Sequence, residues 1–467
     1  MSSLNVPVSE FRDLAGRVTA IAADFLAQLP QARAYPQVSA EVAARAFGDP
    51  LPEAGLGAHA LDALSEVLAL SRPPGGRFFG YVLGSGEPVA ALADLLASVL
   101  NQNVTAWRSA PAAVTLERHL LRSLAAALGC QGFSGSLCGG GSMANLMGLA
   151  MAREAHLPAN ESGAQRGVVY ASSEAHMSVA KAVALLGVGR ENLRLIDTDD
   201  RYRMRPQALR DAVLADRAAG HTPFAVVATA GTVNTGSIDP LVDIAAVCRE
   251  QRLWMHVDGA YGAGAALAVP EKFSGLDAAD SLSLDAHKWL YQPLDCGVLL
   301  FRNPEAARTA FSFSGDYARS LAEDPVEAFA FFDESLELSR RFRALKLWLS
   351  LRYHGLGAFR RAIRADLDHA RLLAECVSGT PALELVAPSE LSAVCFRFRH
   401  EGALEDANRL NAAILRRLIE RGRVYLSNAT LGGRFALRAC FVNHRTTEAD
   451  VGEIVPEVVA AAREVLS

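Results

Sequence analysis

The sequence lacks several features that would assign it at once to a large class of proteins. It has 467 residues without a run of lysine and arginine, and its formal net charge at pH 7 is −5, so we expect no nucleic acid partner. The seven cysteines are scattered, and none belongs to a C-x-x-C pair. This usage predicts neither a bound metal nor a disulfide framework, and it suits a reducing cytoplasm.

Long apolar runs are also missing. The alanine-rich run AVALLGVG (182–189) is far shorter than the roughly 20 residues of a membrane span, so we expect no membrane partner. The N-terminal MSSLNVPVSEFRDL has no basic segment followed by an apolar one, which predicts no signal peptide. The content of 51% hydrophobic and 21% charged residues is ordinary for a globular protein of two or three domains.

Helical periodicity dominates the first 72 residues, and a loop rich in glycine and proline follows, SRPPGGRFFGYVLGSGEP. From about residue 135 to 302, short β-rich runs alternate with helical runs. We predict strands within the segments 167–172, 193–198, 224–231, 254–260, 280–285 and 297–302. Such alternation predicts an α/β domain with a mostly parallel sheet, whose ligands bind at the carboxyl ends of the strands.

The rest of the chain predicts a smaller unit. A long helix is expected from about Leu338 to His354, and the last hundred residues combine helical runs with the strand-like AVCFRFRH and RFALRACFV. We therefore expect an N-terminal helical segment, a large domain and a small C-terminal α/β domain, with the boundaries 1–80, 81–355 and 356–467.

A glycine-rich turn enters a helix at SLCGGGSMANLMGLAMAR (136–153). Free N–H groups and a partial positive charge at a helix N-terminus can hold a phosphate, and the Ser142 hydroxyl can add a hydrogen bond. The same letters fit the dinucleotide pattern G-x-G-x-x-A, although we predict no preceding strand–turn–helix unit with an acidic residue at the required distance. A plain tight turn is the third interpretation.

Two further segments place polar side chains after predicted strands. His176, in SSEAHMSVAKA, stands at a helix start, where its ring is either structural or stacks on a flat cofactor. In VATAGTVNTGSIDPL (227–241), a strand runs into a loop in which Thr232, Asn234 and Thr235 are good polar contacts for a ligand. Ordinary turn chemistry explains this loop equally well.

Asp258 and Lys288 are the most informative polar residues. Asp258 ends the strand-like WMHVD, where a carboxylate is costly unless it meets a cation or a strong donor, although it could also cap the next turn. Lys288 lies in SLSLDAHKWL, between a histidine and Trp289, and apolar surroundings favour the neutral amine that attacks an aldehyde. A phosphate turn, an acid and such a lysine together match pyridoxal phosphate.

At this point the sequence resembles a known family, the group II pyridoxal-phosphate-dependent amino acid decarboxylases of fold type I, which include aromatic-amino-acid, tyrosine, histidine and glutamate decarboxylases. The resemblance covers about residues 75 to 450, in the order of the family. It rests on the segments FFGYV, GGGSMANL, SSEAHMSVAKA, ATAGTVNTGSIDPL, WMHVDGAYG, LDAHKWL, LSRRFRALKLW and LRACFVNHRTT. It implies the aspartate aminotransferase-like fold.

The resemblance implies a role for each matching residue around the cofactor. Lys288 is expected to hold the cofactor covalently, and Asp258 to pair with the ring nitrogen. His176 and Ala260 are expected on opposite faces of the ring. The other expected contacts are to the phosphate, from Ser142, the backbone of Met143 and His287, and to the ring side, from Thr232.

The resemblance also implies residues that act on the substrate. Tyr317 lies in the segment that matches the mobile loop of the family and is expected to return a proton to Cα. Arg438, in LRAC, is expected to bind the substrate carboxylate, and Tyr81 to face the substrate. The chain departs from the family with GTV for GTT, with VDGAY for VDAAY and with Thr105 near a position where the animal aromatic decarboxylases carry phenylalanine. These departures leave the amino acid substrate open.

The expected reaction is decarboxylation of an L-amino acid to the amine and CO2, in a homodimer with the site at the subunit interface. Decarboxylation with oxidative deamination to an aldehyde is the alternative with the same cofactor, and the tyrosine at 317 argues against it. A non-catalytic paralogue and a nicotinamide dehydrogenase are two further hypotheses. The intact set of Lys288, Asp258 and His176 disfavours the first of them.

Overall fold

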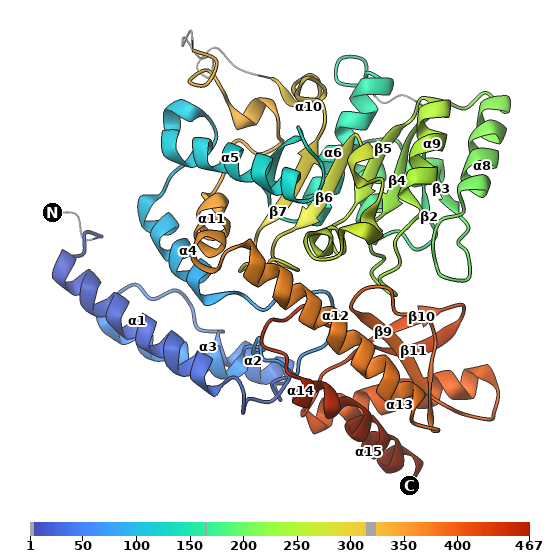
Figure 1. Ribbon diagram of the computed structural model, residues 1–467. Coiled ribbons are helices and arrows are strands. Elements are labelled where there is room, and N and C mark those ends of the chain that lie inside the picture. The colour runs from blue at the N-terminus through green and yellow to red at the C-terminus, as the bar shows by residue number, and fades with distance from the viewer. Residues whose placement is uncertain (1–3, 164–165, 314–323) are drawn as a thin grey trace.

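The computed structural model describes residues 4–163, 166–313 and 324–467. Figure 1 shows a large body built around one sheet, a smaller body with its own sheet, and N-terminal helices that run along the side of both. The N-terminal helices are α1 (Val8–Gln28), α2 (Ala40–Ala46) and α3 (Leu64–Leu70). None of their residues is buried within the chain, so these helices present much of their apolar surface outwards.

A seven-stranded sheet forms the centre of the large body, in the order β1-β7-β6-β5-β4-β2-β3. The pairs from β6 through β5, β4 and β2 to β3 are parallel, whereas β7 is antiparallel to both β1 and β6. The expected mostly parallel sheet is therefore confirmed. The strands are β1 (Ser134–Cys138), β2 (Val168–Ser172), β3 (Leu193–Ile196), β4 (Pro223–Thr229), β5 (Trp254–Asp258), β6 (Ser281–Asp285) and β7 (Gly297–Phe301).

Helices cover this sheet, as the apolar character of its strands requires. Every residue of β4, β5, β6 and β7 is buried, which is typical of parallel strands packed on both faces. The α-helices of the large body are α4 (Pro88–Leu100), α5 (Pro111–Ala127), α6 (Gly141–His156), α7 (Met177–Leu185), α8 (Pro206–Ala218), α9 (Leu241–Gln251), α10 (Pro304–Phe311) and α11 (Arg343–His354). Short 3-10 helices span 57–63, 107–109, 190–192, 263–267, 270–273, 276–278 and 331–333.

Two local elements differ from the expectation. A strand, β1, does precede the glycine turn, although its letters SGSLC have little β character; pairing along its full length with β7 stabilises it. The helix expected from Leu338 begins only at Arg343. Arg340 is held outside the helix because its guanidinium donates to the carbonyl of Val104 at 2.7 Å and contacts the buried carboxylate of Glu117.

The small body has a four-stranded antiparallel sheet in the order β10-β11-β9-β8. Its strands are β8 (Leu383–Leu385), β9 (Ala393–Phe398), β10 (Ser427–Leu431) and β11 (Arg434–Cys440), and its helices are α12 (Leu356–Ser378), α13 (Leu404–Arg421), α14 (Glu448–Gly452) and α15 (Ile454–Leu466). The domain boundaries at residues 80 and 355 stay a prediction. Over the described ranges, no helix combines the length and the apolar character needed to cross a bilayer.

His444 joins the small body to the loop before α4. Its Nδ1 lies 2.7 Å from the hydroxyl of Ser85, and its ring meets Tyr291 edge-on at 5.3 Å between centroids. Burial lowers the pKa of His444 to about 4, and the charge of Arg445 adds to the effect. The folded protein therefore binds this proton less readily than the unfolded chain, whose histidines titrate near 6.5.

The replacement His444→Asn tests this linkage. Stability due to the neutral ring is present above pH 6.5 and is lost as the pH falls toward 4, because only the unfolded chain then gains the proton. Between pH 7 and pH 5 the wild type should lose about 2 kcal/mol relative to the variant. Urea unfolding of both proteins at the two pH values measures this difference. An equal pH response of wild type and variant would contradict the buried neutral state.

Candidate active site

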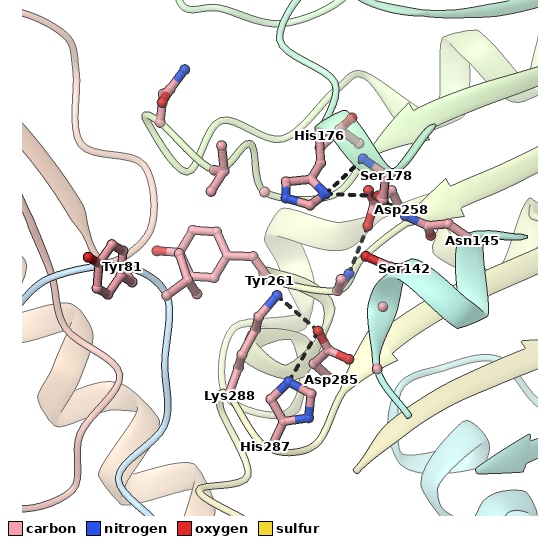
Figure 2. A pocket seen from close by; sticks show the side chains of 18 of the residues that line it. Tyr81, Ser142, Asn145, His176, Ser178, Asp258, Tyr261, Asp285, His287 and Lys288 are labelled. Carbon is pink, nitrogen blue, oxygen red and sulfur yellow. Dashed lines mark hydrogen bonds and ion pairs between the residues drawn. The ribbon is translucent and has the colours of Figure 1, made fainter. Parts of the chain in front are cut away.

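A cavity of about 740 Å³ lies where the three central strands end. The last residues of β4, β5 and β6, which are Thr229, Asp258 and Asp285, all line its wall. The glycine turn before α6 and the start of α7 form a second side, and residues of the small body close a third. Figure 2 shows the side chains that converge there.

Lys288 reaches this cavity from the turn after β6. Its Nζ lies 2.9 Å from Oδ2 of Asp285, and its side chain is 18% exposed. Nε2 of His287 lies 3.5 Å from the same oxygen. Because Nδ1 of His287 accepts the backbone N–H of Cys296 at 3.2 Å, Nε2 carries the proton of the neutral ring, and burial lowers the pKa of His287. The amine of Lys288 is thus held at the cavity by an aspartate that the sequence interpretation left without a role.

Asp258 is 5% exposed and surrounded by donors. Its Oδ2 accepts from Nδ2 of Asn145 at 2.9 Å. Its Oδ1 accepts from the hydroxyl of Ser283 and from the backbone N–H of Ala260, both at 3.2 Å. A buried carboxylate with this support is prepared to meet a cationic partner in the cavity rather than to cap a turn.

His176 precedes α7 and caps it, since its Nδ1 accepts the backbone N–H of Ser178 at 3.2 Å. The Ser178 hydroxyl lies 2.8 Å from the same nitrogen. Burial lowers the pKa of His176, so the ring is neutral at pH 7, with its proton on Nε2. His176 therefore caps α7 with one ring nitrogen and lines the cavity at the same time.

The glycine turn forms the remaining wall. Gly140 has φ of +140° and precedes α6, and no side chain caps this helix. A Cβ on Gly141 would lie 2.6 Å from Cβ of Ala260, so only glycine leaves the turn this close to β5. Ser142 and Met143 follow and also line the cavity. An uncapped helix N-terminus with a hydroxyl beside it suits a phosphate.

Arg438 enters from β11 and is 3% exposed. Its Nε donates to the carbonyl of Asn234 at 3.1 Å, and its Nη1 donates to the hydroxyl of Ser427 at 3.3 Å and to the carbonyl of Tyr81 at 3.4 Å. Its buried Nη2 has no hydrogen-bond partner among the described residues. A buried guanidinium N–H without a partner is costly, so this group is ready to bind an anion. Tyr81 lines the same part of the wall.

Thr232, a predicted site residue, is not brought to the cavity wall. The hydroxyl of Thr232 lies 2.8 Å from that of Thr235, accepts the backbone N–H of Ser237 at 3.1 Å, and is fully buried behind the loop. Val233 and Asn234 line the cavity in its place. Tyr317 lies outside the described residues.

Besides Asp285, sequence reasoning missed three residues that organise the site, which are Asn145, Ser178 and Ser283. Asn145 is a polar residue within the apolar run MANLMGLAM, and a buried amide at that place is a signal of a specific partner. Ser178 and Ser283 carried no comparable signal, because serine is common at helix starts and beside strand ends.

The set of groups fits pyridoxal phosphate: a lysine amine, a supported carboxylate at a strand end and an uncapped helix N-terminus open into one cavity. Comparison with known proteins decides the family. Residues 73–399 match the family model described as a pyridoxal-dependent decarboxylase conserved domain. The chain belongs to this decarboxylase family.

Individual relatives agree over nearly the whole chain. An aromatic-L-amino-acid decarboxylase of Bacillus atrophaeus is 34% identical, over 99% of this chain and 98% of that protein. A crystal structure of Oryza sativa TDC with PLP and tryptamine has a TM-score of 0.93 at 28% identity and covers 100% of both chains. The structure of Rhodiola rosea 4-hydroxyphenylacetaldehyde synthase has a TM-score of 0.89 at 29% identity, with 99% of this chain and 100% of that chain covered.

Family membership confirms four predictions made from the sequence. The fold is the fold type I of pyridoxal-phosphate enzymes, the cofactor is pyridoxal phosphate, the protein is a carboxy-lyase, and its reaction is the decarboxylation of an amino acid. The hypothesis of a nicotinamide dehydrogenase, which the glycine turn suggested, is therefore wrong. The role of each residue in this decarboxylase stays a prediction.

Proposed function

We propose that the cavity of Figure 2 releases CO2 from an L-amino acid and returns the amine, with the cofactor held between α6 and Lys288. The observation that carries this proposal is the convergence of Lys288, Asp258 and the N-terminus of α6 on one cavity. Pyridoxal phosphate, when bound, supplies an electron sink for the electron pair that CO2 leaves behind.

Each predicted cofactor contact has a definite task in this proposal. Lys288 would hold the cofactor covalently through its amine. Asp258 keeps the ring nitrogen protonated, and its two supported oxygens hold the charge that this requires. His176 and Ala260 confine the ring between them. The phosphate contacts are Ser142, the backbone near Met143 and His287, of which His287 offers its Nε2–H; a contact from Thr232 to the ring would require a change of its present hydrogen bonds.

We propose that Arg438 binds the substrate carboxylate through Nη2. The replacement Arg438→Gln should raise KM about tenfold to a hundredfold, because a charge-assisted hydrogen bond contributes about 1.5–3 kcal/mol. Affinity for the amine product, which lacks the carboxylate, should not change. Steady-state kinetics and product inhibition measure both quantities.

Arg434 offers a matched control for this prediction. It lies four residues earlier on β11, and its guanidinium donates to the carbonyl of Val386 at 3.3 Å, away from the cavity. Arg434→Gln should leave KM as in the wild type. A wild-type KM for Arg438→Gln, or an equal loss of affinity for substrate and amine, would contradict the proposed carboxylate contact.

The two candidate activities of this site, decarboxylation to an amine and decarboxylation with oxidative deamination to an aldehyde, differ in their product. We propose the amine, with Tyr317 as the proton donor to Cα, and Tyr81 beside the substrate. Incubation with each common L-amino acid, with CO2 counted and the product identified by mass, tests the activity and names the substrate. Formation of aldehyde, ammonia and peroxide in place of amine would favour the alternative, which the similarity to an aldehyde synthase keeps in view.

We also propose a cytoplasmic homodimer with the site at the interface. The outer face of α4 supports the dimer, because its large apolar side chains are about half exposed in the single chain: Leu92, Leu95, Leu96, Val99 and Leu100. All seven cysteines are free, and six of them are buried, which suits a reducing compartment. A solution mass of one chain would contradict the dimer.

A further inference from the structure

Asn145 lies between the side chains of Asp258 and His176, two of the proposed cofactor contacts. It is 1% exposed, and its Nδ2 donates to Oδ2 of Asp258 and to the hydroxyl of Ser178, both at 2.9 Å. The Ser178 hydroxyl in turn lies 2.8 Å from Nδ1 of His176. Asn145 also lines the cavity, and Figure 2 shows its side chain beside those of Asp258 and Ser178. One amide therefore contacts Asp258 directly and His176 through one hydroxyl.

The orientation of this amide is set from the other side by His256. Oδ1 of Asn145 lies 2.9 Å from Nε2 of His256. A carbonyl oxygen only accepts, so Nε2 carries the proton and Nδ1 is an acceptor. Nδ1 lies 2.8 Å from the hydroxyl of Ser281, which itself accepts the indole N–H of Trp254 at 2.8 Å.

Because the carboxylate of Asp258 only accepts, the chain of hydrogen bonds has one consistent direction. It runs from the Trp254 indole through Ser281 and His256 to Asn145, and then to both Asp258 and Ser178. His256 is fully buried, and burial lowers its pKa to about 4, so the ring is neutral and keeps one tautomer at pH 7. If the amide of Asn145 were turned over, its Oδ1 would face the carboxylate oxygen of Asp258, and its Nδ2–H would face the Nε2–H of His256. Two acceptors and two donors would then meet in a buried site, which is costly.

Helix α6 is shaped to admit this chain. A Cβ on Gly148 would lie 2.5 Å from Nδ1 of His256, so glycine at this place allows the imidazole to lie against the helix. The backbone thus makes room for a ring whose polar contacts, within the described residues, are to Asn145 and Ser281. A plain hydrophobic contact between α6 and β5 would need neither the ring nor the glycine.

We propose that Asn145 is a positioning residue that sets Asp258 and His176 together, and that His256, held by Ser281, supports the orientation of its amide by donating to Oδ1. The proposal rests on the proposed function, in which Asp258 pairs with the ring nitrogen and His176 covers one ring face. The donated hydrogen bond stabilises the carboxylate form of Asp258, and so leaves the proton on the cofactor nitrogen.

The test uses the full-length protein loaded with pyridoxal phosphate that carries ¹⁵N in its ring. The ¹⁵N chemical shift separates a protonated from an unprotonated ring nitrogen. The wild type should stay protonated from pH 6 to pH 9. Asn145→Ala, and the near-isosteric but apolar Asn145→Leu, should lose the proton within this range and should bind the cofactor about tenfold to a hundredfold more weakly, since each removes a hydrogen bond to a buried charge.

Tyr170→Phe is the matched control. It removes a buried hydrogen bond of strand β2 in the same sheet, from the Tyr170 hydroxyl to Asp216 at 2.8 Å, and neither residue lines the cavity. It should lower stability without moving the ¹⁵N shift or the cofactor affinity. Asn145 variants that keep the shift and the affinity of the wild type would overturn the proposal.

A measurement on the unaltered chain keeps the proposal testable if the Asn145 variants do not fold. The ring ¹⁵N shifts of His256 should show a neutral imidazole with its proton on Nε2 at pH 7, with or without cofactor. A proton on Nδ1 alone would make Nε2 an acceptor, reverse the amide of Asn145 and overturn the proposal. Failure of the wild type to take up pyridoxal phosphate would instead contradict the proposed function. In that case the tautomer of His256 would still test the hydrogen-bond chain.

Discussion

Lys288→Ala is expected to abolish covalent attachment of pyridoxal phosphate and to reduce CO2 release about 10³-fold or more, because the amine holds the cofactor and presents it to the substrate as an activated, covalently bound group. The sequence has only four lysines, Lys181, Lys272, Lys288 and Lys346, and only Lys288 lines the cavity in the described part of the chain. Borohydride reduction, which makes the lysine–cofactor bond permanent, followed by peptide mapping should label Lys288 alone.

Two of the other lysines serve as controls for this experiment. Lys181 is exposed on α7, and Lys181→Ala should keep the yellow colour of the bound cofactor and the full activity. Lys346 is fully buried and pairs with Asp94 at 2.9 Å, so it should stay unlabelled. A Lys288→Ala protein with wild-type activity, or a label on another lysine, would overturn the proposed role.

Tyr317→Phe is expected to lower amine formation about 100-fold or more, which is the contribution typical of a well-placed general acid. Without the phenol, the carbon left by CO2 is protonated slowly, and oxygen can compete for its electrons. The variant should then consume O2 and release aldehyde, ammonia and hydrogen peroxide. Parallel assays of CO2, amine, aldehyde and peroxide measure this partition.

The partition has two controls. Removal of oxygen should stop aldehyde formation without restoring the amine. Tyr353, whose side chain is exposed on α11, should tolerate the replacement Tyr353→Phe with unchanged products. If Tyr317→Phe produces amine at the wild-type rate, another group is the proton donor.

The sequence by itself determined the order and the type of the elements that carry the chemistry. Alternating apolar segments predicted β5 and β6, and the letters after each strand placed Asp258 and Lys288 at neighbouring strand ends. This much is local: strand periodicity and the parallel arrangement decide that such ends meet at one edge. The match to family motifs then identified pyridoxal phosphate before any contact was known.

Tertiary structure alone decided how side chains within those segments point. Thr232 was expected toward the ring, yet its hydroxyl turns to Thr235 and Ser237. The sequence alone did not single out Asn145, because the role of this residue depends on its contact with His256, which lies 111 positions further along the chain on β5.

The same distinction explains the two elements that differed from expectation. Strand β1 exists because β7 pairs with it, and α11 begins late because Arg340 is bonded to groups more than two hundred positions away. Periodicity and motifs report the energies of neighbours in sequence. The direction of a buried amide, hydroxyl or guanidinium is instead chosen by the donors and acceptors that distant elements bring to it, since a buried polar group without a partner is costly.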